Sequence, residues 1–204
     1  MNLVARINIL SDIHGNLEAL AAVRKDIGEG DIYCLGDLVG YGANPNEVVE
    51  WVKSEKILTV LGNHDYAVVT GDVSWFNIHA QIAALWTRRI ISRENLDFLK
   101  SLPQTRIVEL EGIRLLLVHG SPDDPIFEYA FPETHEHRFR NYLEAFNVDF
   151  IALGHTHIPF IWKSEHGLVF NPGSVGQPRS GAIQACYAEV EVDDKKVEIK
   201  HHLV

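Results

Sequence analysis

Residues 6–16 read RINILSDIHGN, an apolar run that ends in a polar turn with an aspartate and a histidine. The run is typical of a short buried strand, and the pattern after it predicts a helix over residues 17–27 and a second strand over residues 32–35. A further helix over residues 46–55 and a third strand over residues 57–61 follow. This order predicts a parallel sheet with right-handed crossovers, whose functional loops lie at the carboxyl ends of the strands.

Residues 72–102 are predicted to be mostly helical. In the first helix Ile82, Trp86 and Ile90 repeat at four-residue spacing, which is typical of an apolar stripe. Ser92 is a favoured residue before the start of the second helix. We therefore expect the Trp and Ile positions to face the core rather than a ligand.

The second half of the chain consists mainly of short strands. Two of them, at residues 106–110 and 113–118, flank Glu111-Gly112, which is a hairpin signal. One more amphipathic helix is marked by Phe139, Tyr142, Leu143 and Phe146. The other predicted strands are 150–153, 160–163, 168–170, 184–192 and 197–203, the last two joined by a turn at 193–196. Two facing sheets with helices outside would bury this pattern, so the sequence predicts an α/β fold with residues 1–204 as a single domain.

Composition limits the functional classes. The chain has 204 residues, 46% of them apolar, which is enough for one sizeable core. A formal charge of −10 argues against broad electrostatic binding of nucleic acid or of an anionic membrane. No apolar run approaches the roughly 20 residues that span a bilayer, and cleavage of a leader would remove Asp12. We expect a cytoplasmic protein with Cys34 and Cys186 as reduced core residues.

Five polar motifs follow strand-like runs along the chain. They are Asp12-Ile13-His14, Gly36-Asp37, Gly62-Asn63-His64-Asp65, His119-Gly120 and Gly154-His155-Thr156-His157. Carboxylate oxygens, one amide oxygen and several imidazoles suit divalent cations of hard to borderline character. Any one of these histidines alone would be an ordinary loop residue. Together the motifs predict a two-metal hydrolase with the ligands Asp12, His14, Asp37, Asn63, His119, His155 and His157.

The order of these motifs, from residue 12 to about residue 179, resembles that of the calcineurin-like metallophosphoesterase superfamily. The runs at residues 11–16 (SDIHGN) and 171–174 (NPGS) are most similar to its small bacterial and archaeal single-domain phosphodiesterases. The resemblance implies a four-layer sandwich of two mixed β-sheets flanked by helices. It also implies two divalent metal ions, for which manganese, iron, zinc, cobalt and nickel are all suitable.

The resemblance further implies how the ligands are shared. Asp12, His14 and His157 would hold one metal, Asn63, His119 and His155 the other, and Asp37 would bridge them. A hydroxide held between the two metals would attack phosphorus in line. His64 is the further catalytic residue that the resemblance implies: with Asn63 it would bind the phosphate, and it can donate a proton to the leaving oxygen.

One part of the pattern departs from the protein-phosphatase branch, which has an aspartate and an arginine after the bridging aspartate. Gly40 and Tyr41 stand there instead. Gly40 removes a carboxylate that would orient His64, and Tyr41 removes a cation that would grip a dianionic phosphate. A monoanionic diester needs less positive charge, which favours a phosphodiesterase, although Arg179 is a candidate to supply substrate contact from another loop. The sequence leaves open whether Asp65 orients His64.

The expected substrate is a small phosphodiester or a nucleotide phosphoanhydride, and the family adds dinucleoside polyphosphates and cyclic nucleotides as substrate classes. A phosphomonoesterase is the alternative within the enzymes. A non-enzymatic metal-binding scaffold, as in the retromer subunit family, is the alternative outside them. We expect neither a stable nucleic-acid complex nor membrane binding, and an oligomer is compatible with the sequence. The loops at about 66–80 and 121–137 are expected to decide the substrate, with His135 and His137 as surface residues.

Overall fold

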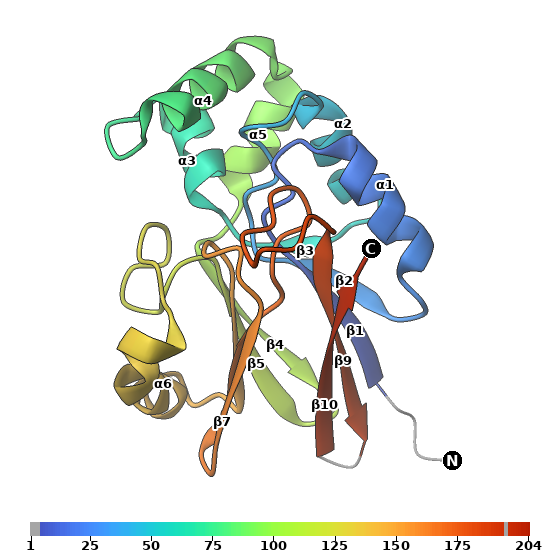
Figure 1. Cartoon of the computed structure of the whole chain (residues 1–204), viewed down its shortest axis with the longest axis vertical. Coiled ribbons are helices and arrows are strands. Elements are labelled where there is room, and N and C mark those ends of the chain that lie inside the picture. Colours follow the sequence, from blue (N-terminus) through green and yellow to red (C-terminus); the bar gives the residue numbers. More distant parts are fainter. Residues whose placement is uncertain (1–4, 194–195) are drawn as a thin grey trace.

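The computed structural model describes residues 5–193 and 196–204, and two facing β-sheets lie at its centre (Figure 1). The first sheet contains β1 (Ala5–Leu10), β2 (Asp31–Cys34), β3 (Leu58–Thr59), β9 (Cys186–Asp193) and β10 (Lys196–Leu203). The second contains β4 (Thr105–Leu110), β5 (Ile113–Val118), β6 (Phe150–Leu153), β7 (Phe160–Ser164) and β8 (Gly167–Asn171). The strand orders are β10–β9–β1–β2–β3 and β4–β5–β6–β8–β7. Each sheet combines parallel with antiparallel pairs, so both are mixed.

The first sheet confirms the predicted alternation of strands and helices. Strand β1 pairs parallel to β2, and β2 pairs parallel to β3, with α1 (Leu17–Asp26) and α2 (Pro45–Ser54) as connections. Leu10 lies opposite Cys34, which lies opposite Thr59. The residues that follow these three strands therefore meet at one edge of the sheet. Strand β3 is shorter than predicted, because the backbone N–H of Leu61 bonds to Pro103 rather than to the neighbouring strand.

The second sheet confirms the predicted hairpin and the strands after it. Glu111 and Gly112 both have positive φ, at 49° and 77°, which suits the tight turn between β4 and β5. Strands β5, β6 and β8 run parallel, and α6 (Pro132–Phe146) connects the first two. The predicted strand pair at the end of the chain is β9 and β10. Its turn includes residues 194–195, which lie outside the described residues.

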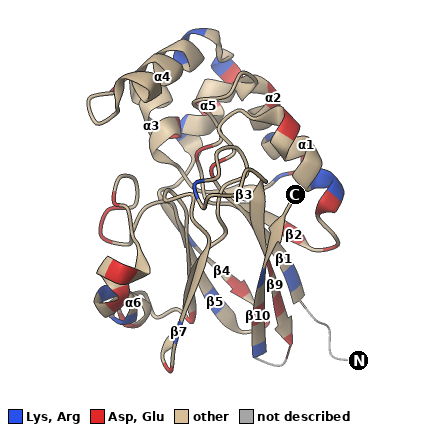
Figure 2. Ribbon diagram, in the orientation of Figure 1, with Lys and Arg blue, Asp and Glu red and all other residues tan. Residues whose placement is uncertain are grey.

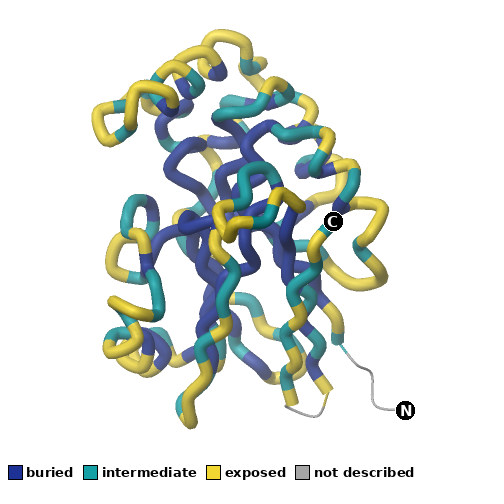
Figure 3. The backbone as a smooth tube through the Cα atoms, in the orientation of Figure 1, coloured by how far each residue is buried: buried dark blue, intermediate teal, exposed yellow. Residues whose placement is uncertain are grey.

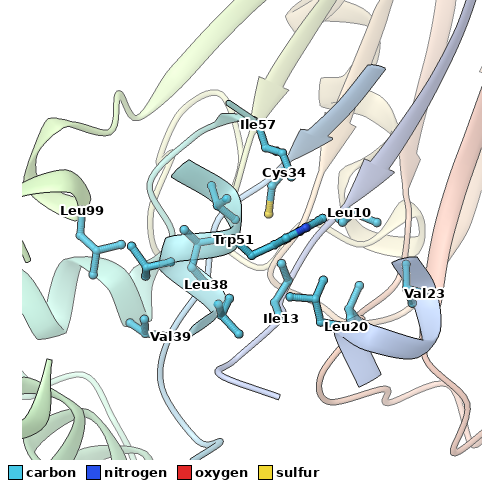
Figure 4. Close-up of a cluster of buried hydrophobic side chains, with 14 of the residues drawn as sticks. Leu10, Ile13, Leu20, Val23, Cys34, Leu38, Val39, Trp51, Ile57 and Leu99 are labelled. Atoms are coloured by element: carbon cyan, nitrogen blue, oxygen red, sulfur yellow. The ribbon is translucent and has the colours of Figure 1, made fainter. Parts of the chain in front are cut away.

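Three apolar clusters separate the layers. Ile9, Leu117 and Phe170 belong to the cluster between the two sheets. Leu10, next to Ile9, points to the opposite face of β1 and joins the cluster under the helices of the first sheet (Figure 4). Helix α6 covers the outer face of the second sheet with Phe139, Tyr142 and Leu143. The succession helix, sheet, sheet, helix is the predicted four-layer sandwich.

The segment between β3 and β4 differs from the prediction. Helix α3 (Asn63–Thr70) begins within a motif that we expected to be a loop, and it is followed by α4 (Ile78–Ile90) and α5 (Arg93–Ser101). Gly71, with a φ of 81°, ends α3, so only residues 71–77 remain as a loop here. The predicted cap of α5 is confirmed, since Ser92 Oγ accepts a hydrogen bond from the backbone N–H of Asn95 at 3.1 Å.

The prediction of a core stripe on α4 is wrong. The exposed fractions of Ile82, Trp86 and Ile90 are 60%, 40% and 41%. Helix α4 instead turns its small residues inward, of which Ala80 and Ala84 are buried. Figure 3 shows the alternation of exposed and buried turns along this helix, and Figure 2 shows its charged residues confined to its carboxyl end. The large side chains lie outside because the small ones allow α4 to pack closely against α3.

Two further expectations from the sequence concern the two cysteines and membrane-spanning segments. Both cysteines are buried free thiols, as expected. Within the described ranges, none of the helices combines the length and the apolar character that crossing a bilayer requires.

Candidate metal centre

The loop after β1 carries Asp12 and His14, both in the left-handed backbone region. Their φ values are 54° and 52°, which residues other than glycine seldom adopt. The backbone N–H of Asp12 bonds to Gly36 at 3.0 Å, and that of His14 bonds to Asp37 at 2.9 Å. The loop after the neighbouring parallel strand thus holds this strained backbone, as is common at functional sites.

The loop after β2 places Asp37 in the same conformation, with a φ of 54°. Its Oδ1 accepts a hydrogen bond from the backbone N–H of His64 at 2.8 Å. A Cβ atom at Gly62 would lie 2.1 Å from that oxygen, so the close approach of the two loops requires glycine. Asn63 and His64 therefore begin α3 directly beside Asp37.

The second sheet contributes three histidines at the same edge. His119 follows β5, while His155 and His157 follow β6 with φ values of 65° and 61°. The backbone N–H of His155 donates to Asp12 Oδ2 at 3.2 Å, and Ser11 Oγ donates to the same oxygen at 2.6 Å. Both sheets therefore end at one cluster of buried polar side chains.

The polar side chains of this cluster converge on Asp37. His14 Nε2 lies 3.7 Å from Asp37 Oδ2, and His119 Nε2 lies 3.6 Å from it on another side. The first group is completed by His157, whose Nε2 lies 3.2 Å from His14 Nε2 and 3.2 Å from Asp12 Oδ1. The second contains Asn63 Oδ1 at 3.0 Å from His119 Nε2, and His155, whose ring centroid is 4.9 Å from that of His119. The seven predicted ligands thus lie in one cluster around Asp37, in which Asp12, His14 and His157 form one close group and Asp12, Asp37 and His119 another.

Each of the four candidate ligand histidines has one ring nitrogen beside a backbone carbonyl. Nδ1 of His14, His119 and His157 lies 3.1, 2.8 and 2.6 Å from the carbonyl oxygens of Val39, Leu35 and Gln177. In His155 the roles are reversed, with Nε2 at 3.1 Å from the carbonyl of Phe127. A carbonyl only accepts hydrogen bonds, so the nitrogen beside it carries the proton of the neutral ring. The other nitrogen of each ring is therefore a lone pair.

Three of these lone pairs, on Nε2 of His14, His119 and His157, lie close to one another or to carboxylate oxygens. Asp12 Oδ1 and Asp37 Oδ2 are buried without a hydrogen-bond partner in the described part of the chain. Such an arrangement of acceptors is repulsive unless cations lie among them. Oxygen and imidazole ligands oriented by backbone carbonyls fit divalent transition metals.

Burial is the largest influence on the titrating groups of the cluster. It raises the pKa of Asp37 well above its usual value, and nearby carboxylates add to that rise. It lowers the pKa of His14 well below its usual value, and that of His155 to about 3. Burial also raises the pKa of Asp12, but the neighbouring imidazoles, His157 first, outweigh it and leave that pKa below its usual value. The imidazoles of His14 and His155 are thus held neutral, the form in which imidazoles bind metals.

A cavity of about 70 Å³ opens onto this cluster. Its lining includes Asp37, Asn63, His64, His155 and His157 from this cluster. The rest of its lining is Tyr41, Trp75, Phe76, Asn77, Ala80, Tyr129 and Arg179.

A model of the calcineurin-like phosphoesterase superfamily domain matches residues 5–195 of the chain. The chain belongs to this superfamily. It is 44% identical to protein MJ0912 of Methanocaldococcus jannaschii, over 95% of this chain and 85% of that protein. It is 28% identical to phosphodiesterase YfcE of Escherichia coli, over 84% of this chain and 79% of that protein. The crystal structure of a metallophosphoesterase from Sphaerobacter thermophilus has a TM-score of 0.81 and 36% identity, covering 97% of this chain and 87% of that one.

In this member of the superfamily Asp65 does not orient His64. The Asp65 carboxylate accepts hydrogen bonds from the backbone N–H groups of Val39 and Gly62, each at 3.2 Å. His64 Nδ1 is buried and has no hydrogen-bond partner in the described residues. The imidazole is held by rings instead, with the Phe76 ring stacked at 4.4 Å between centroids.

Gly40 makes this position of His64 possible. Its φ is 98°, and a Cβ atom built on it would lie 2.4 Å from His64 Nδ1. Residue 40 therefore has no carboxylate to offer, and the His64 imidazole lies directly against its backbone. Burial lowers the pKa of His64 to about 3, so the ring is neutral at pH 7.

Arg179 lies at the mouth of the cavity. Its Nη2 donates to Gln177 Oε1 at 2.7 Å, and the side chain is exposed. Burial raises the pKa of Tyr41, and the nearby positive charge of Arg179 opposes that rise. The structure thus places a cation beside the tyrosine that stands where the protein-phosphatase branch has arginine.

The other residues singled out in the sequence are surface residues or support neighbouring loops. His137 is exposed, and His135 is partly buried, with Nε2 3.4 Å from Glu128 Oε1. Ser174, in the turn at residues 171–174, donates through Oγ to the carbonyl of Asp12 at 2.9 Å. That turn therefore supports the loop after β1, which carries Asp12 and His14.

Three aromatic residues of the cavity were missed in the sequence. Trp75 and Phe76 belong to the loop between α3 and α4, and Tyr129 belongs to the loop between β5 and α6. All three residues lie within the segments that we expected to decide the substrate, at about 66–80 and 121–137. A Trp-Phe pair inside a loop rather than in a helix or strand is a signal that would have found Trp75 and Phe76.

Proposed function

We propose that this protein hydrolyses a phosphodiester or a nucleotide phosphoanhydride with two divalent metal ions. The observation that carries the proposal is the convergence of imidazole lone pairs and unpartnered carboxylate oxygens. Asp12, His14 and His157 would hold one ion, Asn63, His119 and His155 the other. Asp37 Oδ2, which lies between the two groups, would contact both.

When bound, the two ions supply Lewis acidity toward the phosphoryl group and lower the pKa of the attacking water. The chain's own residues provide position and hydrogen bonds. His64 stands at the cavity wall beside Asp37 and His14, with ligand atoms within 4.8 Å of one another. We assign to its imidazole a hydrogen bond to the phosphate, whose negative charge favours the protonated ring, and the protonated ring would then pass its proton to the leaving oxygen. Asn63 would donate to a phosphoryl oxygen through Nδ2, because its Oδ1 faces the metal centre.

The charge of the cavity favours a diester. Arg179 is the one arginine or lysine in its lining within the described residues, and it is exposed. A dianionic monoester is best held by a buried, bidentate arginine, whereas a monoanionic diester needs less. The name of the relative YfcE, a phosphodiesterase, supports the same choice. If Arg179 grips the phosphate strongly, a monoester becomes the preferred substrate.

The test is hydrolysis of bis-p-nitrophenyl phosphate beside p-nitrophenyl phosphate by the manganese-loaded protein, with a chelated sample as control. We expect faster, chelator-sensitive cleavage of the diester. A preference for the monoester would overturn the diester assignment, and Arg179→Ala would then show whether that arginine is the cause. A protein that binds two metal equivalents but cleaves neither compound nor any nucleotide diester would be a scaffold.

A further inference from the structure

The cavity above the metal centre is too small to enclose a whole phosphodiester. Its volume of about 70 Å³ suits a phosphoryl group, whereas pockets that enclose drug-sized ligands measure roughly 300–1,000 Å³. At least one ester group of the substrate must therefore lie outside, against the residues that form the rim.

The rim is aromatic on the side of the two substrate loops. These loops, residues 71–77 and residues 119–131, project from the same side of the molecule, one beside α4 and one beside α6 (Figure 1). Trp75 in the first loop contacts Phe127 in the second, with a distance of 5.8 Å between ring centroids. The cavity thus opens between two loops that meet through aromatic rings.

Two of these rings line the cavity and remain accessible to solvent. Trp75 is 76% exposed, an unusual state for so large an apolar side chain. Tyr129 is 46% exposed, and one face of its ring stacks on His155 at 3.8 Å between centroids. The stack places Tyr129 directly beside a ligand of the metal centre.

A polar group stands next to this surface. Asn77 caps α4 by accepting hydrogen bonds from the backbone N–H groups of His79 and Ala80 through Oδ1. Its Nδ2 has no partner within the described chain and lines the same cavity. An exposed aromatic face with an amide donor beside it matches a flat heterocycle that also carries hydrogen-bond acceptors.

We propose that Trp75 and Tyr129 form a stacking subsite for an aromatic ester group, which makes nucleoside phosphodiesters the substrate class. The proposal rests on the proposed function for the position of the phosphate. Aromatic side chains bind every nucleobase through its π-face, so this subsite selects nucleosides over sugars or lipids without selecting one base. Selection by stacking accounts for loops that show no base-specific motif.

The test compares two ligands that share a ribose and a phosphate and differ only in the base. Adenosine 5′-monophosphate and ribose 5-phosphate are titrated by calorimetry into the manganese-loaded protein. We expect the nucleotide to bind about tenfold more tightly or better. Trp75→Ala should reduce this ratio of dissociation constants roughly tenfold, and Trp75→Phe should restore part of it. Trp86→Ala is the matched control, because Trp86 is a half-exposed tryptophan on α4 that does not line the cavity.

The outcomes separate the inference from the function on which it rests. Equal dissociation constants for the two ligands, or a ratio that Trp75→Ala leaves unchanged, would overturn the stacking subsite even if diesters are hydrolysed. A base preference that depends on Trp75 in a protein without phosphodiesterase activity would support the subsite and overturn the proposed function. A thermal unfolding midpoint equal to that of wild type shows that each variant is folded.

Discussion

The surroundings of the strand ends and of helix α4 were both predicted from the spacing of apolar and polar residues. Only the prediction for the strand ends was correct. Residues 12–14 and 155–157 follow buried strands, and their polar side chains meet where the pattern predicted. Helix α4 has an apolar face at the predicted spacing, but that face is exposed. A buried strand fixes where its next residues lie, whereas an amphipathic helix does not fix which neighbour covers it.

The largest expected effect is at the strand ends. Asp37→Ala removes the oxygen between the two ligand groups, so metal-dependent hydrolysis of bis-p-nitrophenyl phosphate should be lost and the bound metal reduced. Activity and metal content are measured on the same preparation. Asp97→Ala, which removes an exposed carboxylate from α5, should leave both unchanged. Full turnover in the Asp37 variant would break the two-metal assignment.

A second variant separates binding from chemistry within the same region. His64→Ala should keep its metal content while kcat falls about 10²- to 10⁴-fold, as expected for a general acid. Metal loss in step with the fall in kcat would make His64 a ligand instead.

The third prediction concerns the contact between Gly40 and His64. Gly40→Ala introduces a Cβ atom at a φ of 98° and 2.4 Å from His64 Nδ1, so it should lower kcat and destabilise the fold by about 1–3 kcal/mol. Gly112→Ala has a φ of 77° and, among the described residues, no atom within 4 Å of the new Cβ. It should cost only the backbone strain, about 1–2 kcal/mol, and leave kcat unchanged. Urea unfolding and kcat are measured for both, and an unaltered kcat in Gly40→Ala would show that His64 does not depend on this contact.

The exposed face of α4 can be tested directly against the core. Ile82→Ala should change the free energy of unfolding by less than about 0.5 kcal/mol, as for a surface site. Leu20→Ala, at a fully buried position of α1, should cost about 2–5 kcal/mol. An Ile82 effect as large as that of Leu20 would mean that the face is covered in solution, which would remove the contrast between the two regions.

The smallest effect is a pH dependence at His201 in β10. Burial lowers the pKa of His201, and its hydrogen bond to the carbonyl of Asn171 opposes this only in part. The folded state therefore prefers the neutral ring, so the stability it contributes is full above the ordinary pKa of about 6.5 and is lost as pH falls below it. His201→Gln should flatten the fall in unfolding free energy between pH 7.5 and pH 5, measured by urea titration. His79→Gln, on the exposed side of α4, is the control, and an identical slope in wild type and His201→Gln would contradict the prediction.

Sequence by itself determined the succession of strands along the chain and the place of the seven candidate ligands at their ends, though the roles of these ligands stay proposals. Parallel strands end at one edge of a sheet, so Asp12, His14 and Asp37 had to lie together once the strands were recognised. The hairpin at Glu111-Gly112 was equally local, because its turn depends on the two residues that form it. That residues 1–204 form a single domain stays a prediction.

Tertiary structure alone decided the rest. Which face of α4 is buried depends on the packing of its small residues against α3. The spacing of Ile82 and Trp86 does not indicate that their face is the exposed one. The position of His64 depends on Gly40 and Phe76, which lie on separate loops. Trp75 and Tyr129 are 54 positions apart in the numbering and share the lining of the cavity only because two sheets bring their loops together. Each of these features is a contact between segments distant in the chain, and such contacts arise from packing rather than from the local preferences that a sequence pattern expresses.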